Sequence, residues 1–271
     1  MEPVKSKVKR RRLGLGLTAI SSAVLLASCS SDTEWGRIGM PEPATKEAPR
    51  ILSLWQGAWI ASLLVGVLVW ALLIWAIVKY RRKSTDTGIP EQTKYHVPLE
   101  IMYTIVPLIM ILALFWFTAR DQKILTQNPG DQTHSVNVEG WRWSWAFNYL
   151  EEGAYDVGTA GERPTLWLPV DEKVKFILTT PDVLHSFWIP AFLTKMDLVP
   201  GQTNEFTVTP NKLGVFPGKC AELCGVDHSR MIFDVKVVTR AEYDAHIAEL
   251  KAKGQGGVID TGRVVEAGEE E

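Results

Sequence analysis

The hydrophobic positions of this chain follow two different patterns, one before and one after the segment between residues 119 and 132. Residues 51–78 and 97–119 are almost continuously apolar. At about 1.5 Å of rise per residue, each is long enough to cross a hydrocarbon core of roughly 30 Å. From residue 132 onward, short apolar runs alternate with Gly, Pro, Asp and Asn, which is typical of β-strands joined by turns. The pattern therefore predicts two transmembrane helices, followed by a domain built mainly from strands.

The predicted β domain extends over residues 132–240. Its candidate strands are rich in β-branched and aromatic residues and cover 135–148, 165–170, 174–180, 202–209 and 231–238. Short strands at this density favour a sandwich or a barrel. Between them, the acidic and Gly-containing segment 151–163 is expected to be an exposed insertion. Helical spacing of apolar residues predicts a C-terminal helix over 241–252, and the Gly- and Glu-rich residues 253–271 are expected to be a disordered tail.

The first 28 residues have the layout of an export signal. A basic segment precedes a short apolar run, and the run ends Leu26-Ala27-Ser28-Cys29. This ending resembles the lipobox of bacterial lipoproteins, which implies cleavage before Cys29 and attachment of a lipid to its sulfur. The alternative is an uncleaved signal anchor with a buried thiol. Residues 29–50 are then a polar, exported linker.

Charge next to the apolar runs sets the expected orientation in a bacterial membrane. The cluster Lys79-Tyr80-Arg81-Arg82-Lys83 opens the loop 79–96, and the positive-inside rule places this loop in the cytoplasm. Two crossings then place everything after Arg120 on the outer face. Glu100 lies at the cytoplasmic start of the second span, where a carboxylate is costly unless it is solvated or functional. On physical grounds alone, it is a carboxylate at the level of the lipid headgroups.

Composition excludes several classes of protein. The formal net charge of −2 is unlike the basic excess of nucleic-acid-binding proteins, so no nucleic acid is expected as a partner. Three cysteines do not form a disulfide framework, and with Cys29 assigned to the membrane two thiols are left for chemistry. No Cys-x2-Cys-His motif is present, so no haem c is expected to be attached to this chain.

The two remaining thiols belong to a compact group of soft and borderline donors. The spacing is Cys-x3-Cys-x3-His-x2-Met, formed by Cys220, Cys224, His228 and Met231. Thiolate, imidazole and thioether together select copper over magnesium or calcium. His185 lies in a loop between two candidate strands, and one end of a sandwich can bring it beside these residues. The sequence therefore predicts a copper site with two thiols, two imidazoles and a thioether.

Three other interpretations of these residues are open. A disulfide between Cys220 and Cys224 is plausible in an exported domain but leaves His228 and Met231 unexplained. Zinc accepts two Cys and two His, although the thioether argues against it. A mononuclear blue-copper centre needs only one thiolate. Two thiolates suit a pair of coppers bridged by both sulfurs, which favours an electron relay without an open position for substrate.

The segment Cys220–Met231 resembles the binuclear copper A motif of the cytochrome c oxidase subunit 2 family. Residues 182–187 and 195–201 match the same family, and so does the layout of two spans before an exported domain. The resemblance covers roughly residues 54–238. It implies a membrane-anchored all-β fold in which a two-helix hairpin precedes a cupredoxin-like β-sandwich or barrel.

The resemblance also implies a role for individual residues. Both coppers would be bound by the side chains of His185, Cys220, Cys224, His228 and Met231 and by the backbone carbonyl of Glu222. The carboxylate of Glu222 would reach a magnesium ion at the interface with subunit 1. Trp141 would receive electrons, and Glu100 would lie at the mouth of a proton pathway into subunit 1. Arg142 and Phe216 depart from the family pattern, which has Tyr at these positions.

The function implied is that of an oxidase subunit that accepts electrons from a c-type cytochrome. It would relay them to haem in subunit 1, where oxygen is reduced and protons are pumped. Expected partners are subunit 1, other oxidase subunits, membrane lipids and a cytochrome donor, which a supercomplex with a cytochrome bc-type complex could supply. Steering of a basic donor by acidic groups is a further hypothesis, and it involves Glu139, Asp182, Asp197 and Asp227.

Three rivals differ from this interpretation, two in features of the sequence and one in the number of coppers bound. A quinol oxidase subunit 2 would lack the copper ligands, whereas they are all present here. A nitrous oxide reductase would lack the two spans and need a second, His-rich cluster, whereas this chain has five histidines in total. A structural or copper-delivery lipoprotein would not be expected to hold two coppers.

Overall fold

The computed structural model describes residues 33–83, 87–89, 92, 94–127, 130, 132–159 and 161–259. The predicted signal peptide (1–28), the predicted lipidation site Cys29 and the end of the tail (260–271) lie outside these residues. The chain divides into two compact units, residues 1–42 and residues 43–271. The described part of the first unit consists mainly of turns, in which Arg37 Nε donates to the carbonyl of Met40 at 3.2 Å.

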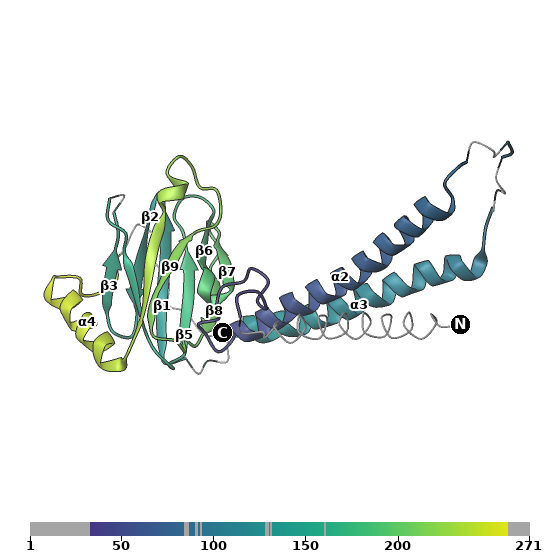
Figure 1. Ribbon diagram of the computed structural model, residues 1–271. Helices are drawn as coiled ribbons and strands as arrows, with labels where there is room; N and C mark the ends of the chain where they lie inside the picture. The colour runs from purple at the N-terminus through teal and green to yellow at the C-terminus, as the bar shows by residue number, and fades with distance from the viewer. Residues whose placement is uncertain are drawn as a thin grey trace, which may run out of the picture. The chain divides into compact units, whose positions relative to one another are not determined.

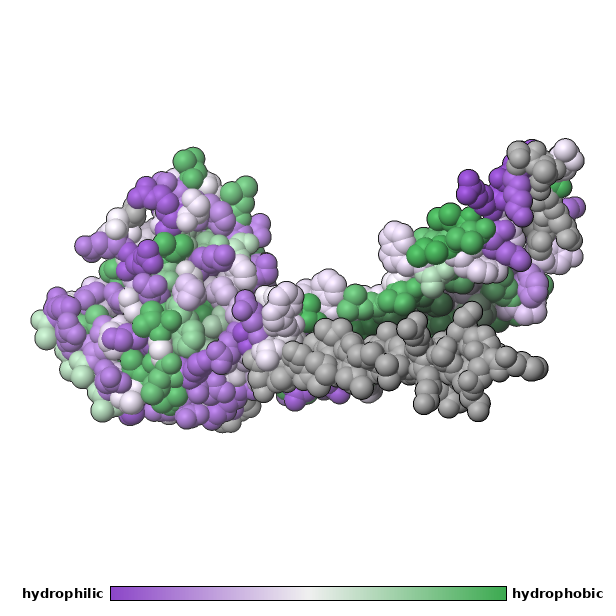
Figure 2. Space-filling view, in the orientation of Figure 1, coloured by the Kyte–Doolittle hydropathy of each residue, from purple (hydrophilic) through white to green (hydrophobic). Residues whose placement is uncertain are grey.

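Two long helices come first in the second unit: α2 spans Ala48–Lys79 and α3 spans Val97–Thr126 (Figure 1). Each has a proline in its first turn, where no N–H partner is needed. Within the described ranges, these two helices are long and apolar enough to cross a membrane. Hydrophobic side chains line them, and hydrophilic ones gather where they are connected (Figure 2). Each helix extends past its apolar run into polar flanking residues.

The described part of the chain after residue 132 contains ten strands in two five-stranded sheets (Figure 1). One sheet has the order β3-β2-β1-β5-β8, formed by Ala154–Val157, Ser144–Tyr149, His134–Trp141, Val174–Thr179 and Asn204–Val208. The other has the order β4-β10-β9-β6-β7, formed by Thr165–Pro169, Ile232–Val238, Gly214–Cys220, His185–Ile189 and Thr194–Leu198. Two pairs, β1 with β5 and β10 with β4, are parallel, and the other pairs are antiparallel. The domain is therefore a mixed sandwich.

An aromatic core fills the space between the two sheets. Phe187 of β6 stacks on Phe233 of β10 at a centroid distance of 5.0 Å, and Trp145 of β2 meets Phe233 edge to face at 5.3 Å. Gly218 on β9 makes this packing possible, because a Cβ there would lie 2.1 Å from the Phe233 ring. Edge-to-face and stacked ring pairs add stability beyond the area they bury. This rigid core supports the loops at the ends of β9 and β10.

The strand pattern differs from the prediction mainly where polar residues interrupt it. Residues 135–148 form two strands, β1 and β2, because the chain reverses between Trp141 and Ser144. Strands β6, β7 and β9 were not predicted. β7 is short and has only two apolar residues, Met196 and Leu198, so its alternation is a weak signal, and β9 contains Gly and Pro.

The expectation of an exposed insertion is wrong in part, and the expectation of a disordered tail does not hold for residues 253–259. Part of the supposed insertion 151–163 is strand β3, which pairs with β2 and buries Ala154 completely. The first residues of the supposed disordered tail also have fixed partners: Gln255 O accepts from Tyr155 N at 3.0 Å, and Ile259 N donates to Asn148 Oδ1 at 2.9 Å. Backbone pairing with β2 and β3 and the side chain of Asn148 hold these segments, and polar composition does not reveal such partners.

Helix α4, Arg240–Ala252, packs on the sandwich next to β3 (Figure 1). A capping box starts it: Thr239 Oγ1 accepts from Glu242 N, and Glu242 Oε2 accepts from Thr239 N at 3.0 Å. Its apolar face, formed by Tyr243, Ile247 and Leu250, is buried. The helix thereby closes the end of the domain at which β1 begins.

Candidate metal centre

Two neighbouring strands bring the first donors together. His185 opens β6 and Cys220 closes β9, and the two strands pair antiparallel, with Phe187 opposite Cys220. A hydrogen bond from Ala221 N to Ser186 O, 3.0 Å long, continues the pairing beyond the strand ends. Side chains two residues apart on a strand point to the same face. His185 and Cys220 are therefore positioned by sheet register, although 35 residues separate them in sequence.

The loop after Cys220 folds back so that both thiols lie beside nitrogen and sulfur donors. The two Sγ atoms are 3.9 Å apart. His185 Nδ1 lies 3.8 Å from Cys220 Sγ, and His228 Nδ1 lies 3.4 Å from Cys224 Sγ. Met231 Sδ is 3.8 Å from Cys224 Sγ. Each thiol thus has its own imidazole, and the thioether lies on the Cys224 side.

A backbone oxygen also faces the cluster. The carbonyl of Glu222 lies 3.2 Å from Cys220 Sγ, while the carboxylate of the same residue belongs to an exposed side chain. Ligand atoms of His185, Cys220 and Cys224 lie within 4.8 Å of one another, and all three residues are buried. The donor set is therefore compact enough for a small metal cluster.

Tryptophans hold the loop in this shape. Trp143 Nε1 donates to the carbonyl of Cys224 at 3.2 Å, and Trp145 Nε1 donates to the carbonyl of Met231 at 3.4 Å. Gly225 has a φ of +123°, and a Cβ there would lie 3.0 Å from the Trp143 ring. Only glycine combines this backbone conformation with such a close ring. The indole donors and the glycine therefore fix the shape of the loop.

Electrostatics favour a bound cation at this site. Burial, together with the neighbouring Cys220, raises the pKa of the Cys224 thiol to about 12. A buried thiolate is costly without a positive partner, and metal binding displaces the thiol proton. Both cysteines are free in the structure. Two buried thiols, two imidazoles and a thioether around one point therefore fit copper and give each of two metal ions a nitrogen donor.

Asp182 orients the first imidazole. Its Oδ1 lies 2.9 Å from His185 Nε2, and its Oδ2 accepts from Arg142 N at 2.9 Å and from Arg142 Nε at 3.2 Å. Burial opposes the charged carboxylate, but these hydrogen bonds outweigh it and hold the pKa of Asp182 well below its usual range. Burial also lowers the pKa of His185, against the pull of Asp182. His185 is thus a neutral imidazole with Nε2 engaged and Nδ1 facing the sulfur, as a metal ligand requires.

The other predicted site residues lie at different places in the structure. Trp141 ends β1 half-buried and pairs with Ser144, while the indoles that donate to the copper loop (residues 220–231) are those of Trp143 and Trp145. Glu100 lies in the first turn of α3, where its Oε1 accepts from His96 N at 2.9 Å. These contacts of Trp141 and Glu100 do not involve the sulfur and nitrogen donors of the cluster.

Sequence reasoning misjudged the acidic groups and missed one orienting residue. Glu139 is buried, and Asp182 is engaged with Arg142 and His185, so neither is a free surface charge for steering. Asp182 is one of the proposed steering residues, yet its carboxylate is engaged with the imidazole of His185. The three-residue spacing between Asp182 and His185 was the available signal.

Comparisons with known proteins agree with this geometry. Residues 134–238 match the family "Cytochrome C oxidase subunit II, periplasmic domain", and residues 33–119 match "Cytochrome C oxidase subunit II, transmembrane domain". The "Probable cytochrome c oxidase subunit 2" of Streptomyces avermitilis is 46% identical over 93% of this chain and 91% of its own length. The cytochrome c oxidase subunit 2 of Mycobacterium bovis is 33% identical over 88% of this chain and 82% of its own length.

Among solved structures, the periplasmic domain of subunit II of the cytochrome oxidase of Bradyrhizobium japonicum is 29% identical. The similarity covers 45% of this chain and 96% of that one, with a TM-score of 0.42.

Proposed function

Because this chain belongs to the cytochrome c oxidase subunit 2 family, we propose that its donor cluster holds the binuclear copper A centre of a haem-copper oxidase. The proposed ligands are the side chains of His185, Cys220, Cys224, His228 and Met231 and the backbone carbonyl of Glu222. The observation that supports them best is the pairing of each buried thiol with its own imidazole. A mononuclear copper site would need only one of these thiols.

The chain itself supplies a rigid, preorganised cage. When bound, the copper pair supplies a one-electron carrier whose charge is shared between two metal ions. Asp182 fixes the imidazole of His185, and the indoles of Trp143 and Trp145 hold the loop carbonyls. Trp145 also fills the core below His185, at a centroid distance of 6.3 Å. Because these contacts hold the proposed ligands in place, the reorganisation energy of electron transfer is small.

The finer steps rest on family membership and the position of the residues. Electrons enter from a c-type cytochrome near Trp141 and pass to haem in subunit 1, where oxygen is reduced and protons are pumped. Glu222 extends its exposed carboxylate towards a magnesium ion shared with subunit 1, and Glu100 opens a proton pathway into that subunit. The donor cytochrome comes from a separate protein or from a bc-type complex in a supercomplex.

The chain is a membrane protein whose copper domain lies on the outer face. We further propose that the chain carries a bacterial signal peptide of lipoprotein type, which is cleaved before Cys29, and that membrane lipids surround α2 and α3. The basic residues at the end of α2 then lie in the cytoplasm.

Metal analysis of the purified oxidase tests the copper assignment. The wild-type subunit is expected to hold two coppers with a mixed-valence spectrum, and Cys224→Ser is expected to lose that spectrum and at least one copper. The matched control is Cys29→Ser, which removes the third cysteine and is expected to keep both coppers while losing the lipid mass. One copper or zinc in the wild-type subunit would overturn the proposal.

A further inference from the structure

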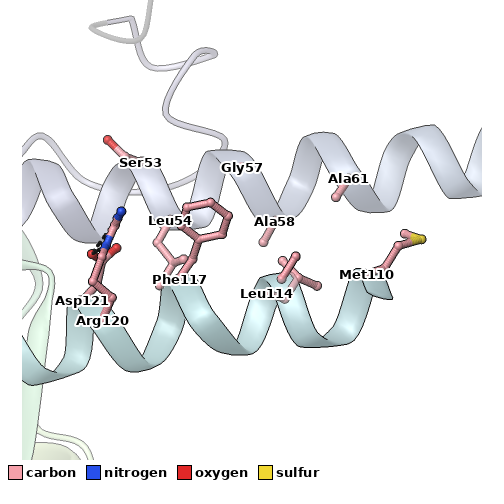
Figure 3. A pocket seen from close by; sticks show the side chains of 11 residues that line it. Ser53, Leu54, Gly57, Ala58, Ala61, Met110, Leu114, Phe117, Arg120 and Asp121 are labelled. Atoms are coloured by element: carbon pink, nitrogen blue, oxygen red, sulfur yellow. Dashed lines mark hydrogen bonds and ion pairs between the residues drawn. The ribbon is translucent and has the colours of Figure 1, made fainter. Parts of the chain in front are cut away.

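A groove between α2 and α3 is not explained by electron transfer. It encloses about 440 Å³ and lies between one face of each helix (Figure 3). The lining residues of α2 are Ser53, Leu54, Gly57, Ala58 and Ala61. Those of α3 are Met110, Ala113, Leu114, Phe117, Arg120 and Asp121. Its volume lies within the roughly 300–1,000 Å³ of small-molecule sites.

The groove exists because small residues face large ones. Gly57, Ala58 and Ala61 leave the α2 side shallow, while Leu114 and Phe117 project from α3 (Figure 3). A Cβ added at Gly57 would meet nothing within 4 Å, so the space beside it is open. Water has too few polar partners along such walls to occupy it. The shape and apolar walls of the space suit a hydrocarbon chain.

At one end of the groove, two guanidinium groups share a single oxygen of Asp121. Arg50 NH1 lies 3.1 Å from Asp121 Oδ1, and Arg120 Nε and NH2 each lie 2.9 Å from the same oxygen. One carboxylate balances only one of the two guanidinium groups. The Arg50 and Arg120 side chains are 41% and 47% exposed, and each guanidinium carries five N–H donors, more than Asp121 can accept.

The charged end lies at the level of lipid headgroups. Arg50 directly precedes the apolar run of α2, and Arg120 directly follows that of α3. Since the copper domain follows α3, this end belongs to the outer leaflet. The apolar part of the groove extends from there towards the membrane centre, to Ala61 on α2 and Met110 on α3 (Figure 3).

We propose that this groove binds one anionic phospholipid of the outer leaflet, with its phosphate on Arg50 and Arg120 and one acyl chain beside Gly57, Ala58 and Ala61. Guanidinium groups match the oxygens of a phosphate with two parallel hydrogen bonds. Basic pockets between transmembrane helices are a recurring way to hold anionic headgroups. Asp121 has a second role in this site: it orients both arginines and lowers the net charge to that of one cation.

Photo-crosslinking in the complete oxidase tests the proposal. The purified complex is exchanged into nanodiscs of phosphatidylglycerol or of phosphatidylcholine, each with the same photoreactive acyl chain. Label is then mapped by mass spectrometry of peptides from α2 and α3. Phosphatidylglycerol is expected to label the groove at least about fivefold more than phosphatidylcholine, the size expected for one surplus cation.

Two variants separate the headgroup from the acyl chain. Arg120→Gln leaves the Arg50–Asp121 ion pair in place and is expected to abolish the preference for phosphatidylglycerol. Gly57→Leu keeps every charge, fills the groove and is expected to remove the label from it. The matched controls are Lys123→Gln, a nearby cation that does not line the groove, and Gly66→Leu, another open glycine of α2. Both are expected to label like the wild type.

Three results would overturn the proposal. The first is equal labelling by the two lipids, and the second is full labelling of Gly57→Leu. In the third, zero-length crosslinks join residues of the groove to subunit 1 and lipid label is absent, which means that a protein side chain fills the space. Copper content is measured on the same samples, so failure of the lipid site is distinguishable from failure of the copper assignment.

Discussion

Two buried histidines at opposite ends of the β sandwich have opposite surroundings. His185, beside the copper loop, has one nitrogen on Asp182 and the other 3.8 Å from a thiol. His134, at the start of β1, has Nδ1 2.6 Å from Glu152 and Nε2 2.9 Å from Glu172. A histidine with one nitrogen committed can bind a metal through the other nitrogen. A histidine held on both sides by carboxylates is a structural cation.

The pKa values of the two residues follow the same contrast. Burial lowers the pKa of His185, and Asp182 does not fully compensate. Burial also opposes charge on His134, but the hydrogen bonds that its ring donates to Glu152 and Glu172 outweigh it and raise the pKa of His134. Neutral imidazole is the metal-binding form, and imidazolium is the ion-pairing form. The number of carboxylates that contact the ring therefore distinguishes a histidine that can bind a metal from one that stabilises the fold as a cation.

Replacing His134 is the strongest test of this comparison. His134→Gln is expected to cost about 2–3 kcal/mol of folding stability, because Glu152 loses its cationic partner and Glu172 keeps only Arg240. The variant is expected to keep both coppers, since His134 lies away from the loop. Thermal unfolding of the complete chain in detergent, together with copper analysis, measures both effects. Loss of copper with unchanged stability would reverse the two roles.

The contribution of His134 to folding stability is expected to change with pH in a defined direction. The pKa of His134 is raised above its ordinary 6.5, so its stabilisation is complete below about pH 6.5 and is lost as pH rises through the raised value. Burial opposes the charge of Glu152, but the hydrogen bond with His134 outweighs it and lowers the pKa of Glu152 below 4.5. The stability that ionised Glu152 contributes is therefore lost only as the pH falls through that lowered pKa. Arg240 and Tyr243 also face His134 and do not titrate in this range. The alkaline decline should be absent from His134→Gln, and an identical decline in both proteins would contradict this account.

At the other end, Asp182→Asn tests whether His185 needs its carboxylate. Asparagine keeps the shape but removes the negative charge that fixes the imidazole. Loss of such a partner typically costs about 10–100-fold in metal affinity. Competition with a copper chelator measures the loss. The control is Asp197→Asn, which removes an exposed carboxylate on β7 and should keep the wild-type copper affinity. An equal loss of affinity in both variants would mean that the negative charge of the domain matters and that the orientation of the His185 ring does not.

The sequence predicted the helices and the metal donors for physical reasons that apply locally. Continuous apolar runs have few alternatives to membrane spans, and Cys220 to Met231 lie within one short loop. His185 was harder to place, because only the pairing of β6 with β9 brings it to Cys220. The prediction that His185 lies beside Cys220 required a sandwich that brings the two loops together at one end.

Other features depend on contacts that no local pattern records. His134, Glu152, Glu172 and Arg240 come from four separate segments and meet only in the folded domain. The same applies to the tail, whose Ile259 N reaches Asn148. Asp182 shows a different failure, since its acidic character was recognised but its burial beside His185 was not. Polar residues predict surface position poorly when partners are distant in sequence.

The smallest expected effect concerns the start of α4, which delivers Arg240 and Tyr243 to His134. Thr239→Ala removes the oxygen that accepts from Glu242 N and should cost about 1 kcal/mol of stability. Thr239→Ser retains that oxygen and is the matched control. Since α4 supports only the His134 end, the alanine variant should lower the unfolding midpoint and leave the copper spectrum unchanged. A changed copper spectrum would show that the two ends of the sandwich are coupled through the core, and that their opposite surroundings do not make them independent.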